Sequence, residues 1–120
     1  MNVGFGNDSV VVRTITSTLE GGRVLDMTGF EGNVVEAGHV IIKNTLEGTY
    51  KPMPVSDGAY SSLPGGYEYV GILISSVTKA DPFAAILNAG QVCEPAMPYA
   101  LGAIKASFKQ AVPTIVFFAE

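Results

Sequence analysis

The sequence predicts a mainly β, α+β fold: a small mixed β-barrel or sandwich with one short helix and an N-terminal extended β arm or hairpin. Segments of strand length rich in Val, Ile, Thr and Tyr recur along the 120 residues. Short runs of Gly, Pro, Asn and Ser separate them. Only one segment has helical spacing. Roughly six to eight short strands with one helix suit a single small β domain.

The N-terminal third contains two strand-like segments. SVVVRTITSTL, at residues 9–19, has strong strand propensity. The turn formers Glu20–Gly22 follow, and RVLDM at 23–27 is a candidate returning strand. We therefore predict an N-terminal arm or hairpin over residues 1–36 and a compact β-rich domain over residues 37–120.

The compact part opens with a predicted hairpin. VIIKN and TYKPM are strand-like, and Glu47–Gly48 between them suits a tight turn. Pro52 and Pro54 have no N–H group to donate to a neighbouring strand. The second strand of this hairpin should therefore lie at a sheet edge.

YEYVGILISSV, at residues 67–77, is the clearest central strand, and Gly71 interrupts its apolar run. A glycine inside a strand costs stability and usually marks a bulge, a bend or a close backbone approach. We expect Gly71 to let the strand curl as a small barrel closes. Backbone contact with a ligand is the functional alternative.

The remaining strands follow a turn-rich pattern. DPFAAILN is a predicted strand, and GQVCE begins another after a turn at Asn88–Gly90, which gives Gly90 a structural role. PTIVFFAE, at residues 113–120, has strand character.

One helix is predicted between these strands, in MPYALGAIKASFKQ at residues 97–110. Leu101, Ile104 and Phe108 fall at helical spacing and should form its buried face. Pro98 suits the first turn of this helix.

Composition narrows the possible partners. The net charge is -4, and the seven basic residues are scattered, so we expect no nucleic-acid binding. No apolar run approaches the roughly 20 residues of a membrane span, and the first residues lack the pattern of a signal peptide. Only 15% of residues are charged, which suggests that a partner covers part of the surface.

Residues suited to catalysis are almost absent. The single histidine, His39, should be a partly exposed side chain at the start of a strand, and no G-x-S-x-G elbow accompanies it. The lone cysteine, Cys93, indicates a reducing compartment and a half-buried, inert thiol. One His and one Cys cannot supply a closed zinc site, and the acidic residues lack EF-hand spacing. We therefore predict no catalytic residue, metal or cofactor.

Besides a purely structural role, two functional classes stay open. A carbohydrate- or ligand-binding β-module could use tyrosines as a stacking surface. The candidate tyrosines are Tyr60, Tyr67, Tyr69 and Tyr99. The second of these classes is a small enzyme with a pocket in the barrel. The absence of a recognisable set of catalytic residues argues against it.

The order of motifs in residues 37–120 resembles a known family. GHVIIKNTLEGTYKPMPV is followed by a turn-rich loop, YEYVGILISS, FAAILNAGQVCEPAM and the closing PTIVFFAE. This order is similar to that of the lambda-type capsid decoration, or head-stabilising, proteins of tailed bacteriophages and of related phage head-fibre proteins.

The resemblance implies a structural virion protein, made in the host bacterial cytoplasm. It would bind the outer capsid surface as a homotrimer at three-fold positions, clamp the major capsid protein and stabilise the shell. Residues 1–36 depart from the pattern, because two strand-like runs stand where a mainly extended arm is expected. A strand without an assured partner in its own domain is a template for pairing with another chain. We therefore predict capsid attachment through Val10, Val11, Val12, Arg13, Thr14, Ile15 and Thr16.

Overall fold

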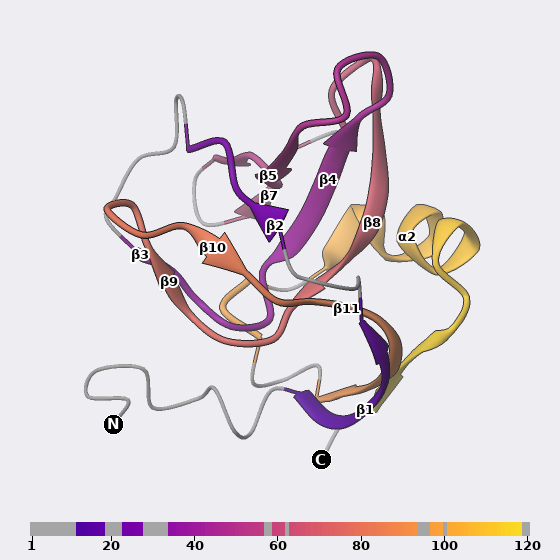
Figure 1. The fold of residues 1–120 in the computed structure, drawn as a ribbon. Coiled ribbons are helices and arrows are strands. Elements are labelled where there is room, and N and C mark those ends of the chain that lie inside the picture. Colours follow the sequence, from indigo (N-terminus) through magenta and orange to yellow (C-terminus); the bar gives the residue numbers. More distant parts are fainter. Residues whose placement is uncertain are drawn as a thin grey trace.

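A computed structural model gives the fold (Figure 1) and describes residues 12–18, 23–27, 34–56, 59–61, 63–93, 97–99 and 101–118. The chain is mostly β, as predicted, with one short α-helix among these residues. Its radius of gyration is 13.0 Å. About 13–14 Å is expected for a compact domain of this length.

The longer strands form one six-stranded sheet with the order β1-β11-β8-β4-β5, and β12 also pairs with β11. The strands are β1 (Val12–Thr18), β4 (Val40–Asn44), β5 (Tyr50–Pro52), β8 (Tyr67–Leu73), β11 (Ile86–Cys93) and β12 (Ile115–Phe118). The path ends at β1 and β5, and the described residues show no pairing between these two strands. The predicted central position of the Gly71 strand, β8, is confirmed.

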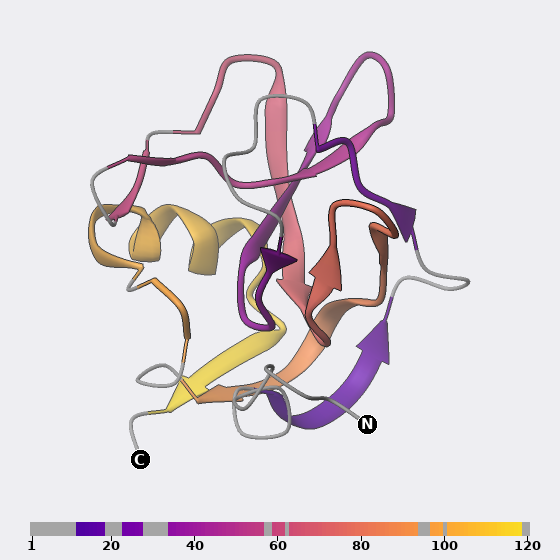
Figure 2. The same cartoon turned by 90° about the vertical axis from the view of Figure 1, so that its left-hand side faces the viewer.

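Strand β11 organises this sheet because three strands pair with it. β1 runs antiparallel along one edge, from Val12 opposite Val92 to Thr18 opposite Leu87. β8 and β12 share the other edge: β8 pairs with the start of β11, and β12 runs parallel to its second half. In Figure 2, β1 and β12 lie with β11 at the lower end of the molecule.

The predicted turn at Asn88–Gly90 is wrong, because β11 continues through these residues without a break. Gly90 pairs with Ile15 on one side and Ile115 on the other. Its φ of +154° lies in a region that is essentially restricted to glycine. This glycine therefore keeps an unusual extended backbone inside a strand and does not end it.

Six strands of two residues form three small ribbons beside the sheet. β2 (Arg23–Val24) pairs with β10 (Phe83–Ala84), β3 (Val34–Val35) with β9 (Val77–Thr78), and β6 (Val55–Ser56) with β7 (Ala59–Tyr60). The predicted hairpin between residues 9–19 and 23–27 is therefore wrong for the described strands: β1 pairs with β11, and β2 pairs with β10. Both partners lie far along the chain, where local turn formers give no information about pairing.

The sheet has a hydrophobic cluster on each face. In β4, Val40 and Ile42 belong to the cluster that contains Phe108, whereas Ile41 belongs to the other cluster. This alternation follows from the period of two in a strand. Burial on both faces explains why β4 and β8 have continuous apolar runs, where a half-exposed strand would alternate apolar and polar residues.

Residues on both sides of the predicted boundary at residues 36 and 37 share the second cluster. Leu25, Met27 and Val35 pack there with Ile41 and Leu73. The boundary does not separate two cores, so the division into 1–36 and 37–120 stays a prediction about attachment.

The predicted β4–β5 hairpin is confirmed: the two strands pair antiparallel, and β5 ends the sheet as its prolines require. Asn44 Oδ1 accepts hydrogen bonds from the N–H groups of Leu46 (2.9 Å) and Glu47 (2.8 Å). Gly48 completes the turn with φ +75°, a left-handed conformation that favours glycine.

The predicted helical face is confirmed, although the helix starts later than expected. A 3₁₀ turn, η2 (Gly102–Ile104), leads into α2 (Lys105–Ala111), and Leu101, Ile104 and Phe108 are buried. Pro98 lies outside the helix, so its predicted place in the first turn is wrong. Gly102 has φ +52°, and this left-handed residue prevents an α-helix from continuing back to Pro98.

Candidate functional site

The segment predicted to attach to a capsid forms part of β1, an end strand of the sheet. Val12 is buried, but the four residues from Ile15 to Thr18 are all exposed. A strand that covers a core on one face would bury alternate residues. From Ile15 to Thr18, both faces of β1 are therefore uncovered. For Arg13 and Thr14, the structure describes the backbone alone. Val10 and Val11 lie outside the described residues.

The pairing of β1 with β11 is irregular. The register shifts between Val12 and Thr14, between Ile15 and Ser17, and again at Thr18. Such bulges bend a strand and increase its twist. Figure 2 shows β1 as a curved strand at the margin of the molecule. Its outer edge has no partner among the described strands, so main-chain groups on that side are free to pair with another chain.

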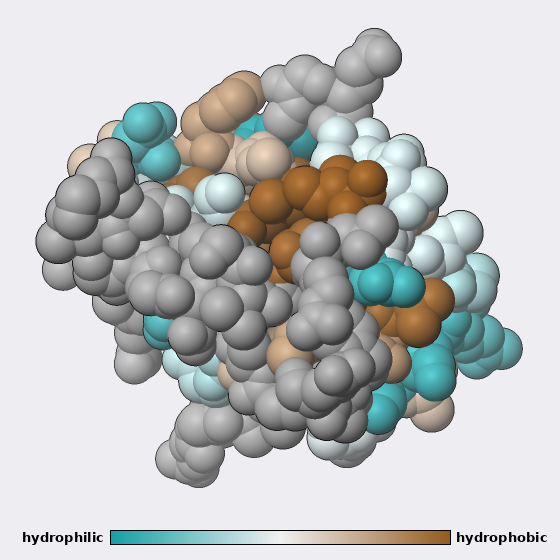
Figure 3. Space-filling model, turned by 90° about the horizontal axis from the view of Figure 1, so that it is seen from below, coloured by the Kyte–Doolittle hydropathy of each residue, from teal (hydrophilic) through white to brown (hydrophobic). Residues whose placement is uncertain are grey.

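Several large hydrophobic side chains are exposed on the described surface. They are Ile15 (54%), Val24 (65%), Leu46 (93%), Phe83 (56%) and Val116 (54%). Val24 and Phe83 are direct cross-strand partners in the β2–β10 ribbon, so their side chains lie on the same face. Figure 3, seen from the side on which β1 lies in Figure 1, shows further apolar surface there.

Gly71 lies where β8 and β11 approach closely. A Cβ atom at this position would overlap Leu87 O, which is backbone and cannot move aside as a side chain can. The β4–β8 register also shifts here, because Ile41 pairs with Gly71 whereas Ile42 pairs with Tyr69. The glycine is therefore required by a close backbone approach next to a bulge, two of the reasons expected from its place in a strand.

His39 is a core residue, and the expectation of a partly exposed histidine is wrong. It is 1% exposed, and its Nε2 donates to Met53 O at 2.9 Å. Tyr60 and Tyr99 contact the imidazole edge-on, with ring centroids at 5.3 and 5.7 Å. Strand position alone could not reveal this burial, because both tyrosines come from distant segments.

Burial also changes the ionisation of this cluster. Desolvation lowers the pKa of His39 from 6.5 to about 4, and the hydrogen bond to Met53 only partly opposes this shift. Desolvation raises the pKa of Tyr60, whose Oη accepts a hydrogen bond from Val40 N at 3.1 Å. His39 and Tyr60 are therefore neutral at pH 7, and the hydrogen bond from Val40 N to Tyr60 fixes the start of β4.

The four candidate stacking tyrosines do not share one surface. Tyr60 and Tyr99 pack against each other, with ring centroids 5.6 Å apart. Tyr69 lines the second hollow described below, but it is 8% exposed and packs against Phe108, so little of its ring is available for stacking. Tyr67 lies apart from these pairs, under Lys51 Nζ at 5.1 Å.

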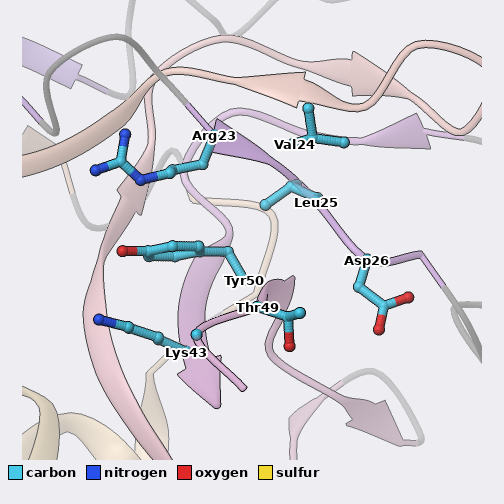
Figure 4. Close-up of a pocket in the computed structure, with 8 residues that line it drawn as sticks. Arg23, Val24, Leu25, Asp26, Lys43, Thr49 and Tyr50 are labelled. Carbon is cyan, nitrogen blue, oxygen red and sulfur yellow. The ribbon is translucent and has the colours of Figure 1, made fainter. Parts of the chain in front are cut away.

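A fifth tyrosine, Tyr50, lies in a surface hollow of about 600 Å³ between β2, β4 and β5 (Figure 4). Arg23 Cζ lies 5.4 Å and Lys43 Nζ 5.7 Å from the centre of its ring. Sequence reasoning missed this group, because its members come from three separate strands with no characteristic spacing.

A second hollow of about 570 Å³ shares Lys43 and Tyr50 with the first and extends to Asn88 and Glu68. Asn88 Oδ1 is buried and has no hydrogen-bond donor among the described residues. Cys93 is 3% exposed, so this thiol is more deeply buried than expected. The described residues contain no group of three His, Cys, Asp or Glu side chains that could hold a metal ion.

None of the described helices has the length and hydrophobicity needed to cross a lipid bilayer. Comparisons with protein-family models, with curated proteins and with solved structures found no match to this chain.

Proposed function

We propose that this protein is a capsid decoration protein of a tailed bacteriophage, which binds the outer shell as a homotrimer and stabilises it. The observation that carries the proposal is β1, an end strand whose outer edge pairs with no other described strand and which has four consecutive exposed residues. The order of motifs in residues 37–120 also supports it.

Attachment would proceed by strand addition. An extended segment of the major capsid protein pairs with the outer edge of β1, and main-chain hydrogen bonds supply most of the affinity. Exposed Ile15 and Thr16 give this contact its side-chain specificity. Three copies on one trimer act at high effective concentration, so each contact can be weak while the trimer stays bound.

The trimer would use a different surface. A closed three-fold assembly repeats one heterologous interface three times. The exposed Val24–Phe83 pair is suited to such an interface, because burying it costs no charge desolvation. Within each subunit, the six-stranded sheet and the three ribbons would together enclose the core as a small barrel or sandwich.

Sedimentation equilibrium tests the trimer. We expect a mass of about 38 kDa, three times the chain mass of 12.5 kDa. Phe83→Asp should shift the protein toward monomer, because it places a charge in the apolar interface. Leu46→Asp, which changes an equally apolar residue at the β4–β5 turn, is the matched control and should stay trimeric. A wild-type monomer at all concentrations would refute the trimer.

Point substitutions on β1 test attachment better than deletion does, because deleting β1 would also remove one of the three strands that pair with β11. The test uses shells assembled from the major capsid protein that is encoded beside this protein. The double variant Ile15→Asp, Thr16→Asp should bind them at least about tenfold more weakly than the wild type does, which corresponds to a loss of about 1.4 kcal/mol in binding free energy. Both residues are exposed, so its melting temperature should stay close to that of the wild type.

Co-sedimentation with these shells provides the measurement, and Leu46→Asp is again the control. Equal binding by the double variant and the wild type would place attachment elsewhere on the molecule. Absence of wild-type binding to the shell would refute the proposed function itself.

A further inference from the structure

The two hollows adjoin, because Lys43 and Tyr50 line both. They are open surface hollows of about 600 and 570 Å³, lined by polar and apolar residues. Val24 lines the first hollow and Ser17 of β1 lines the second, so this surface borders the residues proposed for trimer assembly and attachment.

Hydrogen-bond donors dominate the centre of this surface. Arg23 and Lys43 lie on opposite sides of the Tyr50 ring, and the polar ends of the three side chains point in the same direction (Figure 4). A guanidinium, a phenol and an ammonium group can together donate to several acceptor oxygens. Asp26 also lines the first hollow, but its carboxylate points away from these three groups (Figure 4), so a ligand with negative charge suits the side on which Arg23 and Lys43 present their polar ends.

An acceptor lies beside these donors. Glu68 is the register partner of Lys43 on β8, and it lines the second hollow. Asn88 lines the same hollow, but its Oδ1 is buried, so Glu68 is the acceptor that a ligand can reach. A ligand that matches the whole surface therefore carries hydroxyl groups, which donate, as well as anionic oxygens, which accept.

The ring of Tyr50 separates the two cations, so a single carboxylate cannot contact both. A ligand with repeated carboxylates can do so. An extended acidic peptide fits less well, because the edge of β5 is already occupied: Asp26 N donates to Tyr50 O at 2.7 Å. Without an open strand edge, recognition depends on side chains, as it does for sugars.

We propose that the surface around Arg23, Tyr50 and Lys43 binds an acidic oligosaccharide, whose carboxylates accept from the two cations and whose hydroxyls donate to the neighbouring Glu68. This inference does not rest on the proposed capsid function, because the side chains that it uses belong to one chain and its test needs no capsid shell.

Titration calorimetry with trigalacturonate tests it on the full-length protein, with maltotriose as a neutral trisaccharide and pentaglutamate as an acidic peptide. We expect trigalacturonate to bind at least about tenfold more tightly than either, and added salt to weaken this binding. Arg23→Gln and Lys43→Gln should each reduce affinity about tenfold, because each removes a charge-assisted contact.

Lys51→Gln is the matched control. It removes the same charge from β5, but Lys51 lines neither hollow and lies over Tyr67, so binding should be unchanged. Near-ultraviolet circular dichroism establishes that each variant is folded. Equal binding of maltotriose would overturn the carboxylate contacts, and preferred binding of pentaglutamate would identify a peptide site. No binding of trigalacturonate to the wild type at millimolar concentration, or equal losses in all three variants, would overturn the proposal.

Discussion

Gly71→Val is expected to destabilise the protein by more than about 3 kcal/mol, or to prevent folding. The new Cβ would overlap Leu87 O and would lie 3.0 Å from Ile86 Cγ2. Added atoms in a packed core usually cost about 1–3 kcal/mol. The cost should be higher here because one of the obstacles is main chain in a paired strand. Such a loss lowers the melting temperature of a domain of this size by about 10 °C or more.

Thermal and urea unfolding monitored by circular dichroism provide the measurement. Gly71→Ala should show most of the same loss, because the overlap arises at Cβ. Gly65→Ala is the control: nothing lies within 4 Å of the place that its new Cβ would take, and the change should stay within about 0.5 kcal/mol. A Gly71→Ala variant as stable as Gly65→Ala would show that β8 and β11 can move apart at little cost.

The second large effect is a loss of stability in acid that depends on His39. Its pKa is about 4 in the folded protein and about 6.5 in the unfolded chain, so the folded state resists protonation. The stabilisation is fully present above pH 6.5 and is lost as the pH falls toward 4. At 1.36 kcal/mol for each pKa unit, the loss reaches about 3 kcal/mol.

His39 is the single histidine in the sequence, so its ring protons give one unambiguous NMR titration, with an expected midpoint near pH 4. His39→Gln keeps a donor for Met53 O and has no charge to gain. The difference in unfolding free energy between wild type and variant should therefore shrink or reverse between pH 7 and 4. Carboxylate titration affects both proteins and cancels in this comparison. Parallel pH profiles would contradict the assigned burial.

Local patterns in the sequence predicted the elements whose partners are near in the chain. The β4–β5 hairpin follows from its turn residues and prolines, and the helical face follows from the spacing of Leu101, Ile104 and Phe108. Strand pairing was not predictable at the N-terminus, because β1 and β2 both pair with strands that are distant in sequence. The continuous β11 was missed because Asn88-Ala89-Gly90 has turn composition but is held straight by strands on both sides.

The candidate sites follow the same division. The strand propensity of residues 9–19 indicated β1 correctly, but only the three-dimensional pairing shows that β11 occupies one of its edges and that no other described strand pairs with the opposite edge. The residues next to Arg23, Lys43 and Tyr50 in the sequence form no recognisable motif. The three side chains come together because the segment after β2 is held against β5 by the hydrogen bond from Asp26 N to Tyr50 O. His39 was misjudged because its burial depends on Tyr60 and Tyr99, which the sheet brings to it.

The position of β11 between β1 and β12 has a consequence for how the chain folds during synthesis. Val12 pairs with Val92, 92 − 12 = 80 residues later, so β1 has no native partner until most of the chain has been translated. At about 5–20 residues per second this interval lasts about 4–16 s. β12 follows later still and pairs with the same strand. β1 therefore joins the sheet late, whereas β4, β5 and β8 can pair earlier, and the long-range pairing of β1 predicts slow folding.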